Sequence, residues 1–390
     1  MKDKNNAVKI GILTLHRSIN DGAVLQAYCL QKLLQTRLPQ ARVELIDYRP
    51  WNLEKIEYRK LFTRRFPFVN HYKWSKRSSL QEFINQHCSL STTSCTTNNL
   101  QKVQKFILNQ HYDAIVVGSD VVWQIRENRA YLPIPNIFWL TGLPGIKKIS
   151  FAASADKSEK SLWQQEYIKK QLLDSLKDFH WISVRDEATE QILLNLGLAE
   201  TQLSYMPDPT ILWDFSSLLD TPKNITPSSK GKLAGIAVGS NQMSKTLTQI
   251  MVAKGYQVVN LLGSKLNGQL SLPLNYSLNQ RLGIYPLLDF MVTDRFHGSI
   301  FTLKLSNAPL IFIEESDKYR DYPSKGRDLF QRLGIEAMVL RSEGGEVPDN
   351  LIDKYTAIWD DLSPDINKSL STMRESAEEN LKKFASILTP

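Results

Sequence analysis

The amino-acid sequence predicts an α/β protein made of two βα domains and a C-terminal helical segment. Short β-rich runs alternate with helical patterns, which is typical of βα units and of a largely parallel sheet. The alternation stops over residues 214–232, where proline, glycine and serine residues indicate a linker. It resumes after the linker, so we expect two separate sheets.

The first half of the chain contains five predicted strands joined by helices. The strands are expected at 8–15, 43–46, 114–117, 148–151 and 180–184. Apolar residues at helical spacing predict a helix over about 22–34. The segment 51–110 interrupts the alternation, and we expect helices and loops there. Each strand runs into polar or small residues, and the carboxyl ends of strands form the ligand crevice of open α/β sheets.

The second half repeats the pattern and then becomes helical. Strands are expected at 233–238, 257–262, 287–292, 310–313 and 337–340, and helices at 244–254, 279–286, 299–305 and 325–333. From Pro348 onward the pattern is helical, and residues 366–388 form a long amphipathic stretch. We therefore expect an N-terminal domain over 1–215, a C-terminal domain over 232–345, and C-terminal helices over 346–390. Packing of those helices back on the N-terminal domain is one arrangement open to the chain, and a substrate cleft between the domains is expected.

Composition and charge limit the classes of partner and compartment. The chain of 390 residues is 42% hydrophobic and 23% charged, close to the average for soluble proteins. Its net charge of +8 favours an anionic partner, such as a phosphorylated metabolite, an anionic lipid surface or nucleic acid. Basic and aromatic residues are densest over 58–77, which fits either such a contact or a solvated face. Three cysteines, no secretory signal and no long apolar run predict a cytoplasmic protein, with peripheral membrane contact left open.

Residues 292–300 contain the most closely spaced candidate functional side chains of the sequence, at the point where an apolar run is followed by a predicted helix. The start of a helix offers unpaired N–H groups and partial positive charge to an anion. Arg295 adds a planar fork suited to carboxylate or phosphate, and His297 can transfer a proton near neutral pH. Gly298 allows a sharp turn or a close ligand. The alternative is a buried histidine that only satisfies a hydrogen bond.

These residues belong to a wider resemblance. Four blocks, in order, carry it: 9–14 with 20–28 and 46–49, then 117–123 with 148–154, then 182–187 with 208–210, and finally 294–298. On these blocks the sequence resembles the polysaccharide pyruvyl transferase family from about residue 8 to residue 340. The resemblance implies two Rossmann-like βα domains in a GT-B-like arrangement, with an N-terminal acceptor side and a C-terminal donor side.

The resemblance also implies the reaction. Family members are expected to move a pyruvyl group from phosphoenolpyruvate onto a sugar of a glycan, commonly forming a cyclic ketal and releasing phosphate. Phosphoenolpyruvate is then a donor substrate, and no separate cofactor is expected. Arg185, Arg295 and Gly298 are placed at the donor and His297 at the catalytic position. A surface salt bridge remains the alternative for Arg185, which precedes two acidic residues.

The acceptor side is less defined. Asn20, Asp21, Ser119 and Asp120 are the acceptor-binding candidates, although the first pair could cap a helix and the second could form an Asx turn. Asp21 stands where an aromatic residue is common in the family, and Val121 where glutamine is common. His16 could be structural or could face the acceptor.

Several features narrow the remaining alternatives. The six histidines show no paired spacing, so no metal site is expected, and the Gly-x-Gly-x-x-Gly and Walker-type loops are absent. Lys325 and Arg327 either add to a phosphate site or are surface cations at a helix start. The partners expected are phosphoenolpyruvate and a glycan or lipid-linked sugar, without nucleic acid. A nucleotide-sugar glycosyltransferase and a non-catalytic binding protein of the same fold stay open, as do the accepting sugar and the oligomeric state.

Overall fold

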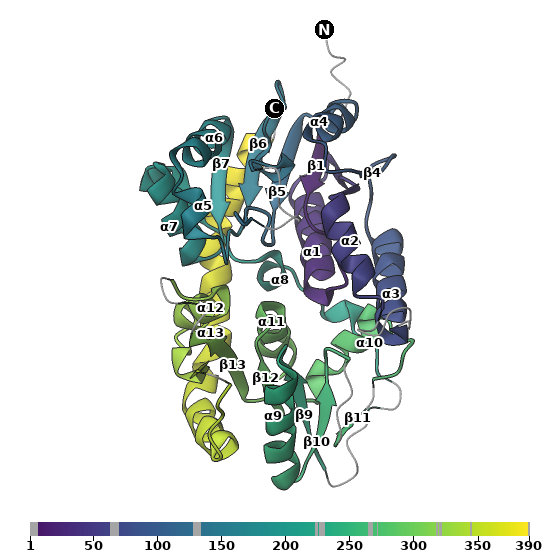
Figure 1. The fold of residues 1–390 in the computed structure, drawn as a ribbon, viewed down its shortest axis with the longest axis vertical. Coiled ribbons are helices and arrows are strands. Elements are labelled where there is room, and N and C mark those ends of the chain that lie inside the picture. Colours follow the sequence, from purple (N-terminus) through teal and green to yellow (C-terminus); the bar gives the residue numbers. More distant parts are fainter. Residues whose placement is uncertain are drawn as a thin grey trace. The chain divides into compact units, whose positions relative to one another are not determined.

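The computed structural model of the chain consists of two compact units (Figure 1). Unit 1 contains residues 1–213 and 374–390, and unit 2 contains residues 214–373. The residues that the structure describes are 7–62, 70–127, 134–222, 225, 231–263, 268–270, 272–316, 319, 322–343 and 345–388. The centre of the basic and aromatic stretch at 58–77 and part of the expected linker at 214–232 lie outside them.

Unit 1 is built on a six-stranded parallel sheet with the order β2-β1-β5-β6-β7-β8. Its strands are β1 (Lys9–Leu13), β2 (Arg42–Leu45), β5 (Ala114–Gly118), β6 (Lys147–Phe151), β7 (Phe179–Val184) and β8 (Leu203–Tyr205). Parallel strands buried on both faces read as continuous apolar runs, which is why the first five were predicted. Strand β8 is shorter, with three half-buried residues, and was not predicted.

The helices of unit 1 follow the strands. They are α1 (Asp21–Arg37), α2 (Trp51–Arg59), α3 (His71–His87), α4 (Leu100–Leu108), α5 (Lys160–Trp163), α6 (Glu166–Leu176), α7 (Glu187–Leu196) and α8 (Pro209–Leu212). The expected helical excursion over 51–110 contains α2, α3 and α4, and also β4 (Cys95–Thr96), which pairs in a small two-stranded sheet with β3 (Tyr48–Arg49) just before the segment. In the core, Trp123 stacks on Trp139 with ring centroids 5.1 Å apart.

Unit 2 has its own six-stranded parallel sheet with the order β11-β10-β9-β12-β13-β14. The strands are β9 (Lys232–Ala237), β10 (Tyr256–Asn260), β11 (Gln269–Leu270), β12 (Phe290–Thr293), β13 (Leu310–Glu315) and β14 (Val339–Ser342). The helices are α9 (Asn241–Ala253), α10 (Leu278–Leu282), α11 (Phe296–Leu305) and α12 (Lys325–Arg332). The expectation of two parallel α/β sheets is therefore confirmed.

A single long helix, α13 (Leu351–Leu388), forms the C-terminal segment (Figure 1). Its first part belongs to unit 2, where the indole nitrogen of Trp359 donates to the carbonyl of Asn307 at 3.1 Å. Its last turns belong to unit 1, where the Phe384 ring lies 5.3 Å from Phe151 and 5.5 Å from Trp181. Among the described residues, no helix is both long and apolar enough to cross a membrane.

Each sheet has one point where the strand order reverses. In unit 1 the chain builds outward from β1 to β2 and then restarts at β5 on the other side of β1. In unit 2 it builds from β9 through β10 to β11 and restarts at β12 on the other side of β9. Ligands of open α/β sheets bind at the carboxyl ends of strands beside such a switch point. The residues after β1, β5, β9 and β12 are therefore the places to look for function.

Candidate functional site

The switch point of unit 2 is held together by the side chain of Thr293, the last residue of β12. Its hydroxyl donates to the carbonyl of Ala237 at the end of β9, at 3.0 Å. The same oxygen accepts from the backbone N–H of Arg295 at 2.9 Å. One fully buried hydroxyl thus joins the two central strands and sets the turn that leads into α11.

The next two residues present a cation at this point. The carboxylate of Asp294 accepts from the backbone N–H of Gly239 at 2.8 Å, and its other oxygen pairs with Nε of Arg295 at 2.9 Å. The side chain of Arg295 remains 51% exposed, so its guanidinium is oriented by one carboxylate and still open to solvent. Because a guanidinium carries donors on both edges of its fork, Arg295 can receive a second anion.

Helix α11 begins directly after Arg295, which is its N-cap residue and makes no side-chain cap hydrogen bond. His297 lies in the first turn and is buried, with its ring 5.3 Å from Phe296 and 6.1 Å from Phe301. Nζ of Lys325 lies 5.6 Å from the centre of the Phe296 ring, which brings a second cation to the start of α11. The first-turn N–H groups, two cations and an imidazole therefore share one corner of unit 2.

Gly298 has a packing role at the same corner. A Cβ atom at this position would lie 2.9 Å from Oγ1 of Thr293 and 3.4 Å from Cβ of Arg295. Glycine therefore lets the first turn of α11 approach the end of β12 without displacing the threonine that sets the turn. The sequence-based role of Gly298 in donor binding stays a prediction, and this close approach is the contact that the structure gives it.

Arg185 lies in unit 1, after the end of β7, and it is fully buried. One of its terminal nitrogens donates to Asp208 at 2.6 Å and to Oγ of Ser119 at 3.1 Å. The other donates to Asp120 at 3.4 Å. Burial lowers the pKa of the guanidinium, but the neighbouring carboxylates, Asp208 first, outweigh it and raise that pKa. The surface salt bridge considered for Arg185 is wrong, since the pair with Asp208 is completely internal.

The geometry of Arg185 also bears on its expected contact with the donor. Its guanidinium already binds three side chains of unit 1, and its side chain has no exposed surface. In this structure it therefore acts as an internal counter-ion that positions the loop after β5. Direct binding of a donor phosphate by Arg185 stays a prediction, and the burial of the side chain weighs against it.

Ser119 and Asp120 follow β5 at the switch point of unit 1. Ser119 is fully buried, and its hydroxyl lies 3.1 Å from both Asp208 and the carbonyl of Ala152. Asp120 has a positive φ of 73°, and its side chain accepts from the N–H of the next residue, Val121, at 2.8 Å. Its side chain is 13% exposed, so of these two residues only Asp120 reaches the surface.

Asn20 and Asp21 occupy the start of α1. The side chain of Asn20 accepts from the N–H of Gly22 at 3.0 Å, so the interpretation as a helix cap is confirmed. The carboxylate of Asp21 binds Nζ of Lys76 on α3 at 2.6 Å. Both side chains thus have structural partners in unit 1. Their sequence-based role in acceptor binding stays a prediction.

The sequence reasoning did not identify Asp208 or Asp47 as site residues. Asp208 precedes a proline and caps α8, with its carboxylate accepting from the N–H of Thr210 at 3.0 Å. That Asp-Pro signal marks a helix start, but it does not reveal the buried pair with Arg185.

Asp47 binds Arg17 through two hydrogen bonds of 3.2 and 2.9 Å and lies 3.3 Å from Nε2 of His16. Burial raises the Asp47 pKa, but hydrogen bonds and charges from these two residues outweigh burial and bring it well below its usual range.

Both ring nitrogens of His16 face acceptors of unit 1, which gives the residue structural partners, and its expected orientation towards an acceptor stays a prediction. Nδ1 lies 3.2 Å from the carbonyl of Thr14, and Nε2 faces Asp47. Within the described parts of the chain, no group of three or more His, Cys, Asp or Glu residues is arranged to hold a metal ion. None of the three cysteines forms a disulfide.

Comparison with known proteins places these features in a family. Residues 20–316 match the model of the family described as polysaccharide pyruvyl transferase. Among solved structures, a protein from Listeria monocytogenes described as a UDP-N-acetylglucosamine 2-epimerase matches with a TM-score of 0.55 at 10% identity, covering 95% of this chain and 91% of that one. The glycosyltransferase SnogD from Streptomyces nogalater matches with a TM-score of 0.42 at 12% identity, covering 98% of this chain and 100% of that one. The sequence has no match among curated proteins.

Proposed function

The chain belongs to the polysaccharide pyruvyl transferase family, and we propose that it transfers a pyruvyl group from phosphoenolpyruvate to a sugar. The acceptor is a sugar of a cell-surface polysaccharide or of its lipid-linked precursor, and the products are a cyclic ketal and phosphate. The observation that carries the proposal is the half-exposed Arg295 at the start of α11, with His297 in the same turn.

The donor carries two anionic groups, a phosphate and a carboxylate, on a three-carbon skeleton. Arg295 offers a planar pair of donors to one of them, and the first-turn N–H groups of α11 offer a second anion site. Lys325 adds a cation on the Phe296 side of the corner. These contacts support unit 2 as the donor-binding side.

The chemistry needs one proton delivered to carbon. When the methylene carbon of the donor gains a proton, it becomes a methyl group, and the neighbouring carbon becomes electrophilic. A sugar hydroxyl adds to that carbon and loses its proton. The carbon–oxygen bond to phosphate then breaks, and a second hydroxyl adds and loses its proton to close the ketal. Histidine is suited to proton transfer near neutral pH, so we assign the first proton to His297.

The acceptor is assigned to unit 1, and a lipid-linked acceptor would bring the enzyme to a membrane. Trp51, Lys55, Tyr58 and Arg59 are exposed at helical spacing on α2. Exposed Trp and Tyr side chains with interspersed cations suit the interface of an anionic bilayer. We therefore propose a cytoplasmic enzyme that contacts the inner face of the membrane, which co-sedimentation with phosphatidylglycerol vesicles would test.

The direct test is to incubate the protein with phosphoenolpyruvate and a panel of methyl hexosides. Phosphorus NMR should show phosphate release that depends on an acceptor, and mass spectrometry should show the ketal adduct. Thermal stabilisation by phosphoenolpyruvate and not by nucleotide sugars is expected. Stabilisation by a nucleotide sugar alone would instead favour a glycosyltransferase. Binding without turnover of any acceptor would favour a non-catalytic protein.

Two variants assign the roles at the corner. His297→Gln should lower turnover by about 10²–10⁴-fold, the usual contribution of general acid–base catalysis, while largely preserving donor affinity. Arg295→Lys keeps the charge but loses the fork, so the KM for phosphoenolpyruvate should rise. Near-normal turnover in the first variant across pH would leave His297 as a structural residue. An unchanged KM in the second would remove Arg295 from donor binding.

A further inference from the structure

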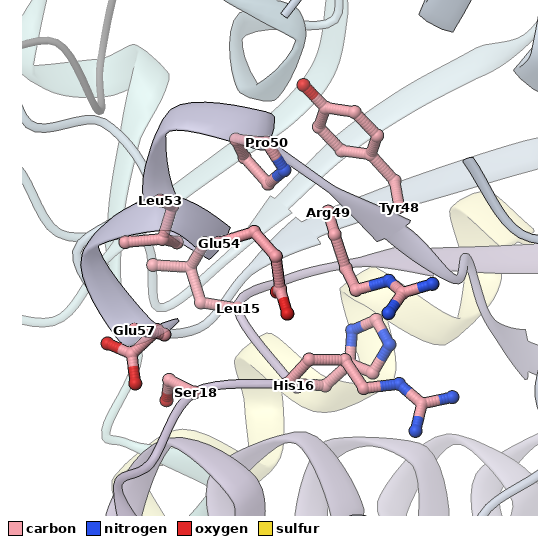
Figure 2. Close-up of a pocket in the computed structure, with 10 residues that line it drawn as sticks. Leu15, His16, Ser18, Tyr48, Arg49, Pro50, Leu53, Glu54 and Glu57 are labelled. Atoms are coloured by element: carbon pink, nitrogen blue, oxygen red, sulfur yellow. The ribbon is translucent and has the colours of Figure 1, made fainter. Parts of the chain in front are cut away.

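A buried glutamate, Glu314, lies at the carboxyl end of β13, the strand that pairs with β12 in the sheet of unit 2. Strand β12 leads into the corner formed by Arg295, His297 and the start of α11. In unit 1, the buried Glu54 and Glu57 line a hollow with a cavity volume of about 20 Å³, room for about one water molecule and too small for a substrate (Figure 2). Of these three glutamates, only Glu314 belongs to the unit that carries the proposed donor-binding residues.

The carboxylate of Glu314 has two different kinds of partner. One oxygen accepts from the backbone N–H of Ser324 at 2.9 Å. The other oxygen lies 3.6 Å from a terminal nitrogen of Arg327 and 3.5 Å from Nε of Arg341, which suits an ion pair but exceeds hydrogen-bond distance. A buried charge needs such pairing. The two guanidiniums therefore balance the charge, and the hydrogen bond goes to Ser324.

That hydrogen bond fixes the start of helix α12. Ser324 is the N-cap residue of α12, and its hydroxyl accepts from the backbone N–H of Arg327 at 3.2 Å. Lys325 follows directly, and its Nζ lies 5.6 Å from the centre of the Phe296 ring, on the first residue of α11. Glu314 therefore holds the residue next to the lysine that faces the corner.

Close packing holds the same helix start against the sheet. A Cβ atom at Gly326 would lie 2.1 Å from Cζ of Phe312 on β13, so glycine lets the first turn of α12 approach that ring. Phe312 is the register partner of Thr293, the residue that sets the turn before Arg295. Helices α11 and α12 also pack against each other. The backbone of Lys325 is thus placed relative to the corner by the sheet itself.

We propose that Glu314 is a positioning residue of the donor site, which keeps the ammonium of Lys325 at the corner by holding the N–H of Ser324. Glu314 does not touch the donor, because its side chain has no exposed surface. Lysine has a long flexible stem, so the place of its ammonium depends on how firmly its backbone is held. The inference rests on the proposed function for the contact of Lys325 with the donor, whereas the placement of Lys325 can be measured without any reaction.

NMR can report that placement. Reductive methylation with isotope-labelled formaldehyde puts observable methyl groups on lysines, and Lys325→Arg identifies the Lys325 signal by its loss. Because Nζ lies near the Phe296 ring, the ring current should shift this signal away from that of an ordinary exposed lysine. Glu314→Leu removes the acceptor at similar size and should reduce the shift, whereas Glu314→Gln keeps an acceptor oxygen and should preserve it. A signal that is unchanged in the leucine variant, or that moves equally in both variants, would overturn the inference.

Kinetics test the consequence for the donor. In an enzyme that consumes phosphoenolpyruvate, Lys325→Met and Glu314→Leu should each raise the KM for phosphoenolpyruvate about tenfold, as for the loss of one hydrogen bond to a charged group. The value of kcat and the KM for the acceptor should change little, and Glu314→Gln should retain most of the donor affinity. The double variant should again show about tenfold, because both changes remove the same contact, and a rise of about a hundredfold would overturn the inference.

Glu336→Gln is the matched control. Glu336 also pairs with Arg327, at 2.9 Å, but from the solvent side, with its side chain 47% exposed. This variant should leave both the Lys325 signal and the KM for phosphoenolpyruvate unchanged. If circular dichroism shows that Glu314→Leu does not fold, Ser324→Ala removes the cap hydroxyl of the same helix start and should move the Lys325 signal in the same direction. An unmoved signal in that variant would overturn the inference.

The two measurements separate this inference from the proposed function. A working enzyme in which Glu314→Leu moves the Lys325 signal but leaves the KM for phosphoenolpyruvate unchanged would make Glu314 a structural residue, and the transferase would stand. A wild-type protein that does not consume phosphoenolpyruvate, although the Lys325 signal moves as expected in Glu314→Leu, would refute the transferase but not the placement of Lys325 by Glu314.

Discussion

Replacing Arg185 with Met should destabilise unit 1, because Arg185 and Asp208 form a pair with no exposed side-chain surface. Met has a similar length but no charge, so the Asp208 carboxylate would be left buried beside Ser119 without its counter-ion. Breaking a buried pair by removing one partner costs about 3–5 kcal/mol. For a domain of about 150–250 residues this corresponds to a Tm lower by about 6–20 °C.

Urea unfolding followed by circular dichroism would measure this change. Arg126→Gln is the control, because its exposed pair with Glu159 should contribute less than about 1 kcal/mol. The double variant Arg185→Met with Asp208→Leu should recover much of the loss, since an apolar pair can replace a buried ion pair. Recovery should fall short by about 1 kcal/mol, because Asp208 also caps α8.

The same experiment decides between two roles for Arg185. A residue that only binds the donor would leave the free energy of unfolding almost unchanged and would weaken binding of phosphoenolpyruvate. If Arg185 is an internal counter-ion, its replacement should lower the free energy of unfolding and leave the binding of phosphoenolpyruvate almost unchanged. A loss below about 1 kcal/mol in Arg185→Met would refute the reasoning from burial, since that is the range of an exposed pair.

Three further predictions follow from other contacts. Gly239→Ala should raise the KM for phosphoenolpyruvate with little loss of stability, because the new Cβ would lie 2.5 Å from a terminal nitrogen of Arg295 and displace its half-exposed guanidinium; an unchanged KM would contradict this. Asp47→Asn should cost about 1.5–3 kcal/mol at pH 7, the value of hydrogen bonds to a charged group. Because the pKa of Asp47 is lowered on folding, its contribution is present above the unfolded-state pKa and is lost as pH falls through the folded-state value. The free energy of unfolding should therefore fall less steeply in the variant than in the wild-type protein as pH drops below about 4. Parallel curves for the two proteins would exclude Asp47 as a cause of acid destabilisation. Burial raises the pKa of the Cys88 thiol to about 12, so iodoacetamide at pH 8 should label Cys88 slowly in the folded protein and quickly in urea, as peptide mapping would show.

Much of the fold could be predicted because a buried parallel strand has a local signature. The runs at β1, β5 and β12 are almost continuously apolar, since both faces of each strand are covered. The two-residue strands β3 and β4 have no such run, and they form only because their partners lie side by side. Strand β8 is half-buried throughout, so its residues carry little apolar signal.

The corner of unit 2 was also predictable, because its residues are consecutive. A strand end, a cation, an imidazole and a helix start occur within a few residues, so local sequence determines their proximity. The sequence did not reveal which residues of the neighbouring strand hold that corner in place by hydrogen bonds. Gly239 and Ala237 come from β9 and the turn that follows it, and they reach Asp294 and Thr293 only because β9 and β12 are neighbours in the sheet.

The sequence by itself therefore determined the two parallel sheets and the order of residues at the corner of unit 2. The tertiary structure alone decided which charged side chains pair with one another in the interior and which remain accessible to solvent. Arg185 and Arg295 both follow a strand, yet one is enclosed by Asp208, 23 positions away, and the other is half exposed beside its own neighbour Asp294. The physical reason is that the environment of a charge depends on all atoms within a few ångströms, and strand order, not sequence separation, brings those atoms together.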